Sequence, residues 1–222
     1  MTTLMLGIDT ATPLTTVAIV RVDVNNGSVD VLADRGHHDA RRHGEVLPKL
    51  ISEALAATGH VPTDLDAVAV GVGPGAYTGL RVGLATAAAL GISLEIPVRG
   101  VVTLDALAFA SGLQEPFAVV TDARRREFFV ARYHDYRSPE SDASVGGPEA
   151  TASMLDGRVV LAPADTPALP GVEFTVCPGP SAGAVCAVVV DRMRVNQPTT
   201  PVRPLYLRRP DVTPSARPKS VL

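Results

Sequence analysis

Short apolar runs separated by polar turns open this chain and predict three strands. Residues 4–8 are apolar and end at Asp9, and a β-branched run covers residues 16–22. We expect these runs to pair as an antiparallel hairpin with an acidic, hydroxyl-rich turn. The Asn-Gly pair at 26–27 predicts a second turn, after which Val29 and Val31 alternate with polar residues on a third strand.

Helical spacing follows the third strand. Apolar residues recur at three- and four-residue intervals from Val46 to Leu55, and Gly59 ends the pattern, which predicts an amphipathic helix. The segment before it is polar and contains Arg41, Arg42 and three histidines that could suggest a metal cluster, His37, His38 and His43. A spacing of five does not align two imidazoles on one helix face, so we predict a solvated loop and no metal site.

The stretch from Val68 to Gly91 changes pattern twice. A β-branched run over 68–72 meets Gly73-Pro74-Gly75, and beyond Thr78 the chain is apolar apart from Arg81. This pattern predicts a buried strand, a tight turn and a helix with Thr78 as its N-cap.

Small residues recur every four positions in that helix and therefore share one face: Gly79, Gly83, Ala87 and Gly91. Glycine inside a helix costs about 1 kcal/mol relative to alanine, so something is expected to pack closely against this face. It could be the protein's own sheet or a partner. A third interpretation is a dinucleotide loop, but G-x-G-x-x-x-G is one residue too long, and Glu95 does not clearly end a strand.

The second half of the chain repeats the opening pattern. An apolar run over 117–121 ends at Asp122, 113 residues after Asp9, and an apolar return strand covers 127–133. We interpret this as an internal duplication with a reduced second copy. We predict a strand over 97–102, a helix over 103–110 capped by Thr103, a polar loop over 138–147, a strand over 159–161 and a helix over 182–193.

The predicted organisation is a first subdomain over 1–101, a reduced second subdomain over 102–196 and a Pro-rich tail over 197–222. Within the tail, residues 204–209 alternate apolar and polar between two prolines, so we expect an extended segment docked at an edge.

Composition narrows the function classes. The chain has 222 residues, of which 46% are hydrophobic, and a net charge of −3, so its bulk charge does not favour nucleic acid. We expect neither a signal peptide nor a membrane anchor, and a cytoplasmic protein whose two cysteines, Cys177 and Cys186, stay reduced and buried.

A family resemblance adds to these predictions. The duplicated three-strand opening resembles the actin, Hsp70 and sugar-kinase group. The segments MLGIDTAT, GVGPGAYTGLRVG and PLYLR resemble, in this order, the three recognisable segments of the TsaB (YeaZ) family. This resemblance implies an α/β, actin/Hsp70-like duplicated fold with a reduced second half. It also implies a partner of TsaD in forming N6-threonylcarbamoyladenosine beside the anticodon of tRNA.

The resemblance implies a non-catalytic role. Thr103 and Leu107 stand where TsaD has its metal-binding histidines, and neither can hold a metal ion in that way. The implied partners are TsaD, TsaE and, in isolation, a second copy, with tRNA reached only through the complex. We expect no cofactor of its own, with ATP or ADP at an interface with TsaD. The alternatives are an actin-like nucleotide-hydrolysing enzyme and a dinucleotide-dependent oxidoreductase.

Three groups of site residues follow. We expect the two Leu-, Val- and Ala-rich helices to pair with like helices of a partner through Leu47, Leu50, Ile51, Tyr77, Gly79, Leu80, Val82, Gly83 and Leu84. A weaker nucleotide site comprises Asp9, Thr10 and Asp122, although Asp at a hairpin turn also satisfies backbone N–H groups. The triplet Arg124–Arg126 is either a solvated charged turn or a contact for tRNA or an acidic surface.

Overall fold

One five-stranded sheet and one six-stranded sheet form the frame of the protein. The structure, a computed structural model, describes residues 2–23 and 26–208. The first sheet has the order β3-β2-β1-β4-β5, in which β2 is antiparallel to β1 and β3, and β4 is parallel to β1 and β5. Its strands are β1 (Thr2–Asp9), β2 (Leu14–Asp23), β3 (Ser28–His38), β4 (Ala67–Gly71) and β5 (Val98–Val101). The helices of this half are α1 (His43–Thr58), α2 (Tyr77–Leu94) and α3 (Thr103–Ser111).

The second sheet repeats this plan. Its order is β11-β10-β6-β7-β8, with β9 also paired to β7, so a hairpin is again extended by antiparallel strands on one side and parallel strands on the other. Its strands are β6 (Phe117–Arg124), β7 (Glu127–Asp135), β8 (Ser138–Pro139), β9 (Ser144–Gly146), β10 (Val159–Pro163) and β11 (Thr175–Cys177). The helices are α4 (Pro148–Leu155) and α5 (Ala182–Arg194).

The matching strand orders confirm the predicted duplication and its reduced second copy. The first half carries the 18-residue helix α2 between β4 and β5. At the corresponding place between β10 and β11, the chain over 164–174 consists of turns and irregular segments. The fold is therefore the expected α/β, actin/Hsp70-like duplication.

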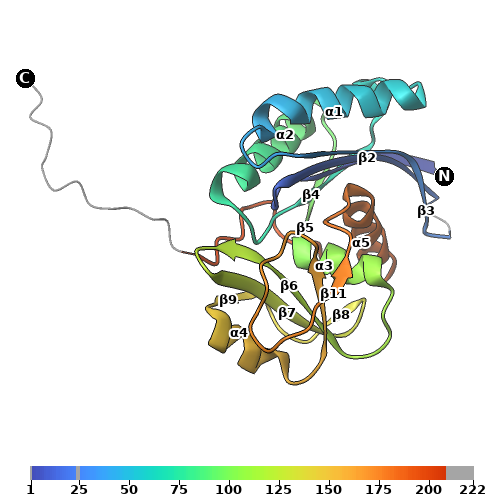
Figure 1. Cartoon of the computed structure of the whole chain (residues 1–222). Helices are drawn as coiled ribbons and strands as arrows, with labels where there is room; N and C mark the ends of the chain where they lie inside the picture. The colour runs from blue at the N-terminus through green and yellow to red at the C-terminus, as the bar shows by residue number, and fades with distance from the viewer. Residues whose placement is uncertain (1, 24–25, 209–222) are drawn as a thin grey trace, which may run out of the picture.

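Helices and sheets alternate in layers (Figure 1). Helices α1 and α2 cover the outer face of the first sheet, and α4 covers the outer face of the second. Helices α3 and α5 lie between the sheets and contact each other. Each of these two helices packs on the sheet of the other half. Helix α5 from the second half packs on β1, β2 and β4, and α3 from the first half packs on β6 and β7. Each half thus completes the core of the other.

Several local predictions need correction. Helix α2 begins at Tyr77 with Ala76 as its N-cap, so Thr78 is not the cap. The N-cap of α3 is Val102, and Thr103 is the first helical residue, with its hydroxyl turned toward the first hairpin. The polar loop predicted over 138–147 contains β8 and β9, which are too short to leave a sequence pattern, and helix α4 after it was not predicted.

The polar segment before α1 also differs from its prediction. His37 and His38 belong to strand β3, and His43 is the first residue of α1 and is buried. The solvated loop is thus limited to residues 39–42. Helix α1 ends as predicted, because Gly59 adopts the left-handed conformation and its N–H caps the last turn.

Candidate functional site

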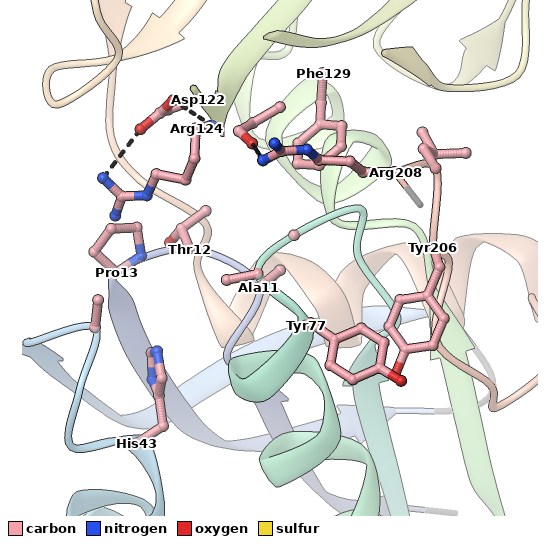
Figure 2. Close-up of a pocket in the computed structure, with 15 residues that line it drawn as sticks. Ala11, Thr12, Pro13, His43, Tyr77, Asp122, Arg124, Phe129, Tyr206 and Arg208 are labelled. Atoms are coloured by element: carbon pink, nitrogen blue, oxygen red, sulfur yellow. Dashed lines mark hydrogen bonds and ion pairs between the residues drawn. The ribbon is translucent and has the colours of Figure 1, made fainter. Parts of the chain in front are cut away.

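A cleft lies between the tips of the two duplicated hairpins (Figure 2). Its volume is about 450 Å³, and both halves of the chain and the C-terminal segment line it. The lining residues are Ala11, Thr12, Pro13, Ala40, His43, Gly75, Ala76, Tyr77, Asp122, Ala123, Arg124, Phe129, Tyr206, Leu207 and Arg208.

Asp9 lies beneath the cleft rather than in its wall. Its side chain is fully buried, Oδ1 accepts the N–H of Ala11 at 2.8 Å, and Oδ2 accepts the hydroxyl of Thr103 at 2.8 Å. A Cβ atom on Gly71 would lie 1.9 Å from Oδ2, so this strand residue must be glycine. Burial raises the pKa of Asp9 to about 6, and the two hydrogen bonds oppose this rise. The carboxylate therefore holds the turn of the first hairpin in place.

Thr10 connects this turn to helix α2. Its hydroxyl donates a hydrogen bond to the carbonyl oxygen of Gly79 at 2.8 Å. A Cβ atom on Gly83 would lie 2.4 Å from Thr10 Oγ1, and one on Gly75 would lie 2.1 Å from the carbonyl oxygen of Ala11. The glycines of the central motif therefore let α2 and its preceding turn pack on the first hairpin. Of the interpretations of the glycine face, internal packing is confirmed.

The same packing removes the basis of the dinucleotide interpretation. The turn between β4 and α2 lies against the protein's own backbone, where Ala76 N–H donates to Ala11 O at 3.2 Å. Glu95 is the left-handed C-cap of α2 and does not end a strand.

His43 is a cleft residue that sequence reasoning placed in a solvated loop. It is 4% exposed, and its Nδ1 atom lies 2.6 Å from Thr15 Oγ1. Burial lowers its pKa, and the charge of Asp39 only partly opposes this. Helical spacing could have revealed the burial, because His43 precedes Val46, Leu47 and Leu50 on one apolar face.

Asp122 is the member of the predicted nucleotide group that lines the cleft. Its Oδ1 atom accepts the backbone N–H of Arg124 at 2.7 Å, and Oδ2 forms an ion pair with the Arg124 guanidinium at 3.2 Å. The carboxylate is therefore engaged by its own hairpin, while Asp9 and Thr10 act below the cleft.

The segment Pro204–Arg208, which we name the C-terminal strap, crosses between the two halves. Leu205 N–H donates to Val72 O at 2.8 Å, which fixes the strap at the end of β4. At its other end, Arg208 pairs with Glu127 at 3.0 Å and donates to the carbonyl oxygen of Ala123 at 3.1 Å. The predicted docking is thus confirmed for Pro204–Arg208, and Arg209 lies outside the described residues. The segment is not fully extended, because Tyr206 N–H donates to Pro204 O at 3.2 Å in a three-residue turn.

An aromatic cluster anchors the middle of the strap. The rings of Tyr206 and Tyr77 stack with centroids 4.5 Å apart and an interplanar angle of 25°. The Arg81 guanidinium lies 3.9 Å from the centre of the Tyr77 ring, and its Nε donates to Tyr206 Oη at 3.0 Å. Sequence reasoning missed the pairing, because Tyr77 and Tyr206 are far apart in the chain.

The predicted interface residues divide by exposure. Seven of the nine are buried in this chain: Leu47, Leu50, Ile51, Gly79, Leu80, Gly83 and Leu84. Tyr77 is 41% exposed, and Val82 is half-buried. The outward side of α2 presents other apolar residues, namely Ala85, Ala89 and Ile92, of which Ile92 is 80% exposed.

Helix α2 is also long and apolar enough to cross a membrane by length and composition, yet its inner face packs on β1 and β4.

Thr103 and Leu107, where the resemblance implies the metal-binding histidines of TsaD, have structural contacts in this protein. Thr103 donates to Asp9, and Leu107 is buried in the core of the second half. Over residues 2–23 and 26–208, no three His, Cys, Asp or Glu side chains group to hold a metal ion.

Comparisons with known proteins find relatives in the formation of N6-threonylcarbamoyladenosine in tRNA. The family model described as tRNA N6-adenosine threonylcarbamoyltransferase (TsaD) matches residues 35–154. A protein of Mycobacterium tuberculosis is 42% identical over 212 residues, which cover 96% of this chain and 95% of that protein. The tRNA threonylcarbamoyladenosine biosynthesis protein TsaB of Escherichia coli is 33% identical over 135 residues, covering 58% of this chain and 54% of that protein.

A solved structure shares the fold. YeaZ from Pseudomonas aeruginosa superposes with a TM-score of 0.72 at 23% identity, covering 92% of this chain and all of that chain. This structural match shows the fold alone. The matching family model and the TsaB sequence relatives mean that the chain belongs to the TsaB (YeaZ) family of tRNA threonylcarbamoyladenosine biosynthesis proteins.

Proposed function

We propose that this protein is a non-catalytic subunit that binds and activates TsaD during the formation of N6-threonylcarbamoyladenosine in tRNA. The names of its relatives support the pathway. On this proposal the protein acts in the cytoplasm, meets tRNA and TsaE within the complex, and needs no cofactor of its own. ATP or ADP at the interface with TsaD remains part of the proposal.

One observation carries the proposed pairing, namely the outward side of α2. Helix α2 is apolar, yet only a third of it is buried, and Ile92 is 80% exposed. A contiguous exposed apolar patch marks an interaction surface, and Ile92 extends the exposed apolar row of Ala85 and Ala89. Helix α1 packs beside α2 on the same sheet, so a partner with two equivalent helices can pair with them about a near two-fold axis.

The location of the contact differs from the sequence prediction. The glycine face of α2 points into this chain, and Leu47, Leu50 and Ile51 of α1 are buried. The proposed contact surface therefore consists of the opposite side of α2, around Tyr77, Ala85 and Ile92. A homodimer would use the same surface in the absence of TsaD.

An actin-like nucleotide hydrolase is the second candidate, because the cleft lies at the junction of two duplicated halves. The contacts of Asp9 count against it. Both carboxylate oxygens already accept hydrogen bonds, and Gly71 leaves no space beside Oδ2. A catalytic Mg²⁺ would have to displace these contacts.

The substitution Ile92→Asp tests the pairing. We expect the variant to keep the far-UV circular dichroism spectrum and melting temperature of the wild type. It should also lose binding to TsaD of the same organism in calorimetry, and lose tRNA modification in a mixture with TsaE and threonylcarbamoyl-adenylate. Val176→Asp is the matched control, because Val176 is 68% exposed on β11 of the other sheet. Unchanged TsaD affinity of Ile92→Asp contradicts the surface, and absence of wild-type binding contradicts the function.

A further inference from the structure

The tip of the second hairpin has an unusual backbone. Strand β6 ends at Arg124 and β7 begins at Glu127, so Arg125 and Arg126 form a two-residue loop. All three arginines have positive φ, at 65°, 54° and 62°. Two-residue hairpin loops with positive φ at both central residues favour Asn-Gly, because this conformation brings Cβ too close to the following carbonyl oxygen. Glycine has no Cβ, and the short polar side chain of Asn offsets the cost by hydrogen-bonding to nearby backbone.

Arginine therefore occupies positions where turn geometry favours Asn and Gly. Arg124 adds a third strained residue at the register shift between Asp122 and Arg124. Strained residues persist where the surrounding structure holds them, and they cluster at functional sites. Three arginines in a conformation that disfavours them make this hairpin tip a candidate functional site.

The backbone at the base of the tip is held by hydrogen bonds and ion pairs, and the arginine side chains are exposed to solvent. Asp122 accepts the Arg124 N–H, and Arg208 of the C-terminal strap holds both Glu127 and the carbonyl oxygen of Ala123. Both carboxylates at the base of the tip are thus engaged in ion pairs. The Arg124 side chain is 57% exposed, and Arg125 and Arg126 are exposed.

The local charge opposes the charge of the whole chain. Four arginines and two carboxylates meet at this tip, although the chain carries a net charge of −3. A concentrated group of exposed guanidinium groups fits a polyanion, because each can contact a phosphate oxygen through two N–H groups.

The geometry points to a direct phosphate-backbone contact between this tip, which we name the arginine tip (Arg124–Arg126), and RNA. The identification of that RNA as tRNA rests on the proposed function. The contact positions the RNA beside the cleft mouth without reading sequence, because guanidinium groups on phosphates carry no base information. Membership of the complex with TsaD is a separate property, located on α2.

The experiment replaces the loop by its preferred turn. In Arg125→Asn/Arg126→Gly, positive φ is accommodated and two charges are lost. Because strain is relieved, we expect the melting temperature of the full chain to rise by about 2 °C. We expect its affinity for an unmodified tRNA transcript, followed by fluorescence anisotropy, to fall about tenfold at low salt. The slope of log K against log salt should become shallower by about 2.

Two further variants separate specific contact from bulk charge. Arg21→Asn/Arg194→Asn removes the same charge far from the cleft and should leave the slope unchanged. Arg21 lies near the C-terminal end of β2 and pairs with Asp30, and Arg194 of α5 lies beside Gly27. Arg125→Lys/Arg126→Lys keeps the charge and should keep most of the affinity. Equal loss of affinity in the Arg21/Arg194 variant, or none in the Asn-Gly variant, overturns the inference.

The remaining outcomes also decide the question. If the wild type fails to bind tRNA at low salt, the RNA contact is wrong. If the Asn-Gly variant loses affinity for TsaD instead, the arginine tip contacts an acidic protein surface, and the RNA contact is also wrong. Either result leaves the proposed function intact, because the effect of Ile92→Asp on TsaD binding is measured independently.

Discussion

The hydroxyl of Thr103 donates a hydrogen bond to Asp9 Oδ2 at 2.8 Å, across 94 residues of sequence. This bond links the end of β1 to the first turn of α3, and α3 packs on the other sheet. The resemblance to TsaD implies that Thr103 replaces a histidine that binds a metal ion in TsaD. In this protein the same position stabilises the turn of the first hairpin.

The buried carboxylate predicts a pH dependence of stability. The pKa of Asp9 is about 6 in the folded protein against 3.8 for an ordinary Asp, because burial disfavours the charged form. The folded state binds this proton more tightly, so the contribution of Asp9 to the free energy of unfolding falls as pH rises from about 4 to 6. We expect Asp9→Asn to lack this component, which is on the order of 2–3 kcal/mol. Urea unfolding at pH 4 and pH 7.5 measures most of this component. A stability difference between wild type and variant that is independent of pH contradicts the assignment.

Packing between α2 and the first hairpin predicts the effect of enlarging Gly83. Because a Cβ atom at this position would lie 2.4 Å from Thr10 Oγ1, Gly83→Leu should lower the free energy of unfolding by about 1–3 kcal/mol or more. Gly44→Ala is the control. Its new methyl group would meet no atom within 4 Å and replaces glycine on a helix, so thermal unfolding should show equal or higher stability. Equal melting temperatures of Gly83→Leu and wild type contradict this packing.

The C-terminal strap should be ordered in solution. The amide of Leu205 donates to Val72 O, so its hydrogen exchange should be slower than that of an unbonded amide. The stacked rings should also be coupled, and a double-mutant cycle with Tyr77→Ala and Tyr206→Ala should give about 0.5–1 kcal/mol. Additive effects of the two substitutions, together with fast exchange at Leu205, contradict a docked strap.

An ion pair between α3 and α5 predicts asymmetric costs. Asp105 accepts hydrogen bonds from Arg192 at 2.5 Å and from Tyr133 Oη at 2.9 Å, with the Asp105 and Arg192 side chains only 15–16% exposed. Arg192→Ala leaves a largely buried carboxylate, and we expect a loss of about 3 kcal/mol in the free energy of unfolding. Arg192→Ala/Asp105→Ala should recover part of this loss. A double variant less stable than Arg192→Ala contradicts the pairing.

The elements that the sequence predicted correctly are those with strong local patterns. The two hairpins begin with continuous apolar runs that end at Asp9 and near Asp122, and α1 has an apolar face with a glycine stop. Helix α4 has no such pattern, because only Thr151 and Leu155 of its eight residues are buried. Local sequence therefore predicts a long buried element better than a short surface one.

The arrangement of the candidate site depended on contacts between distant segments. The sequence located Asp9, Thr10 and Asp122 at hairpin turns, but which of them faces the cleft depends on Thr103 and Gly79. The wall formed by the C-terminal strap depends on Tyr77 and Glu127, far away in the chain. Periodicity within a segment carries no information about such partners.

The exchanged helices α3 and α5 have a consequence for how this protein can change over evolutionary time. A duplicated protein can lose one copy if each copy covers its own sheet. Here, removal of the second copy would uncover β1, β2 and β4, where Met5, Ala18 and Val185 share one core. Each copy supplies a helix that covers the sheet of the other copy. The reduced half can therefore lack peripheral elements, such as a helix between β10 and β11. It must keep α5, because the first half requires this helix to cover its sheet.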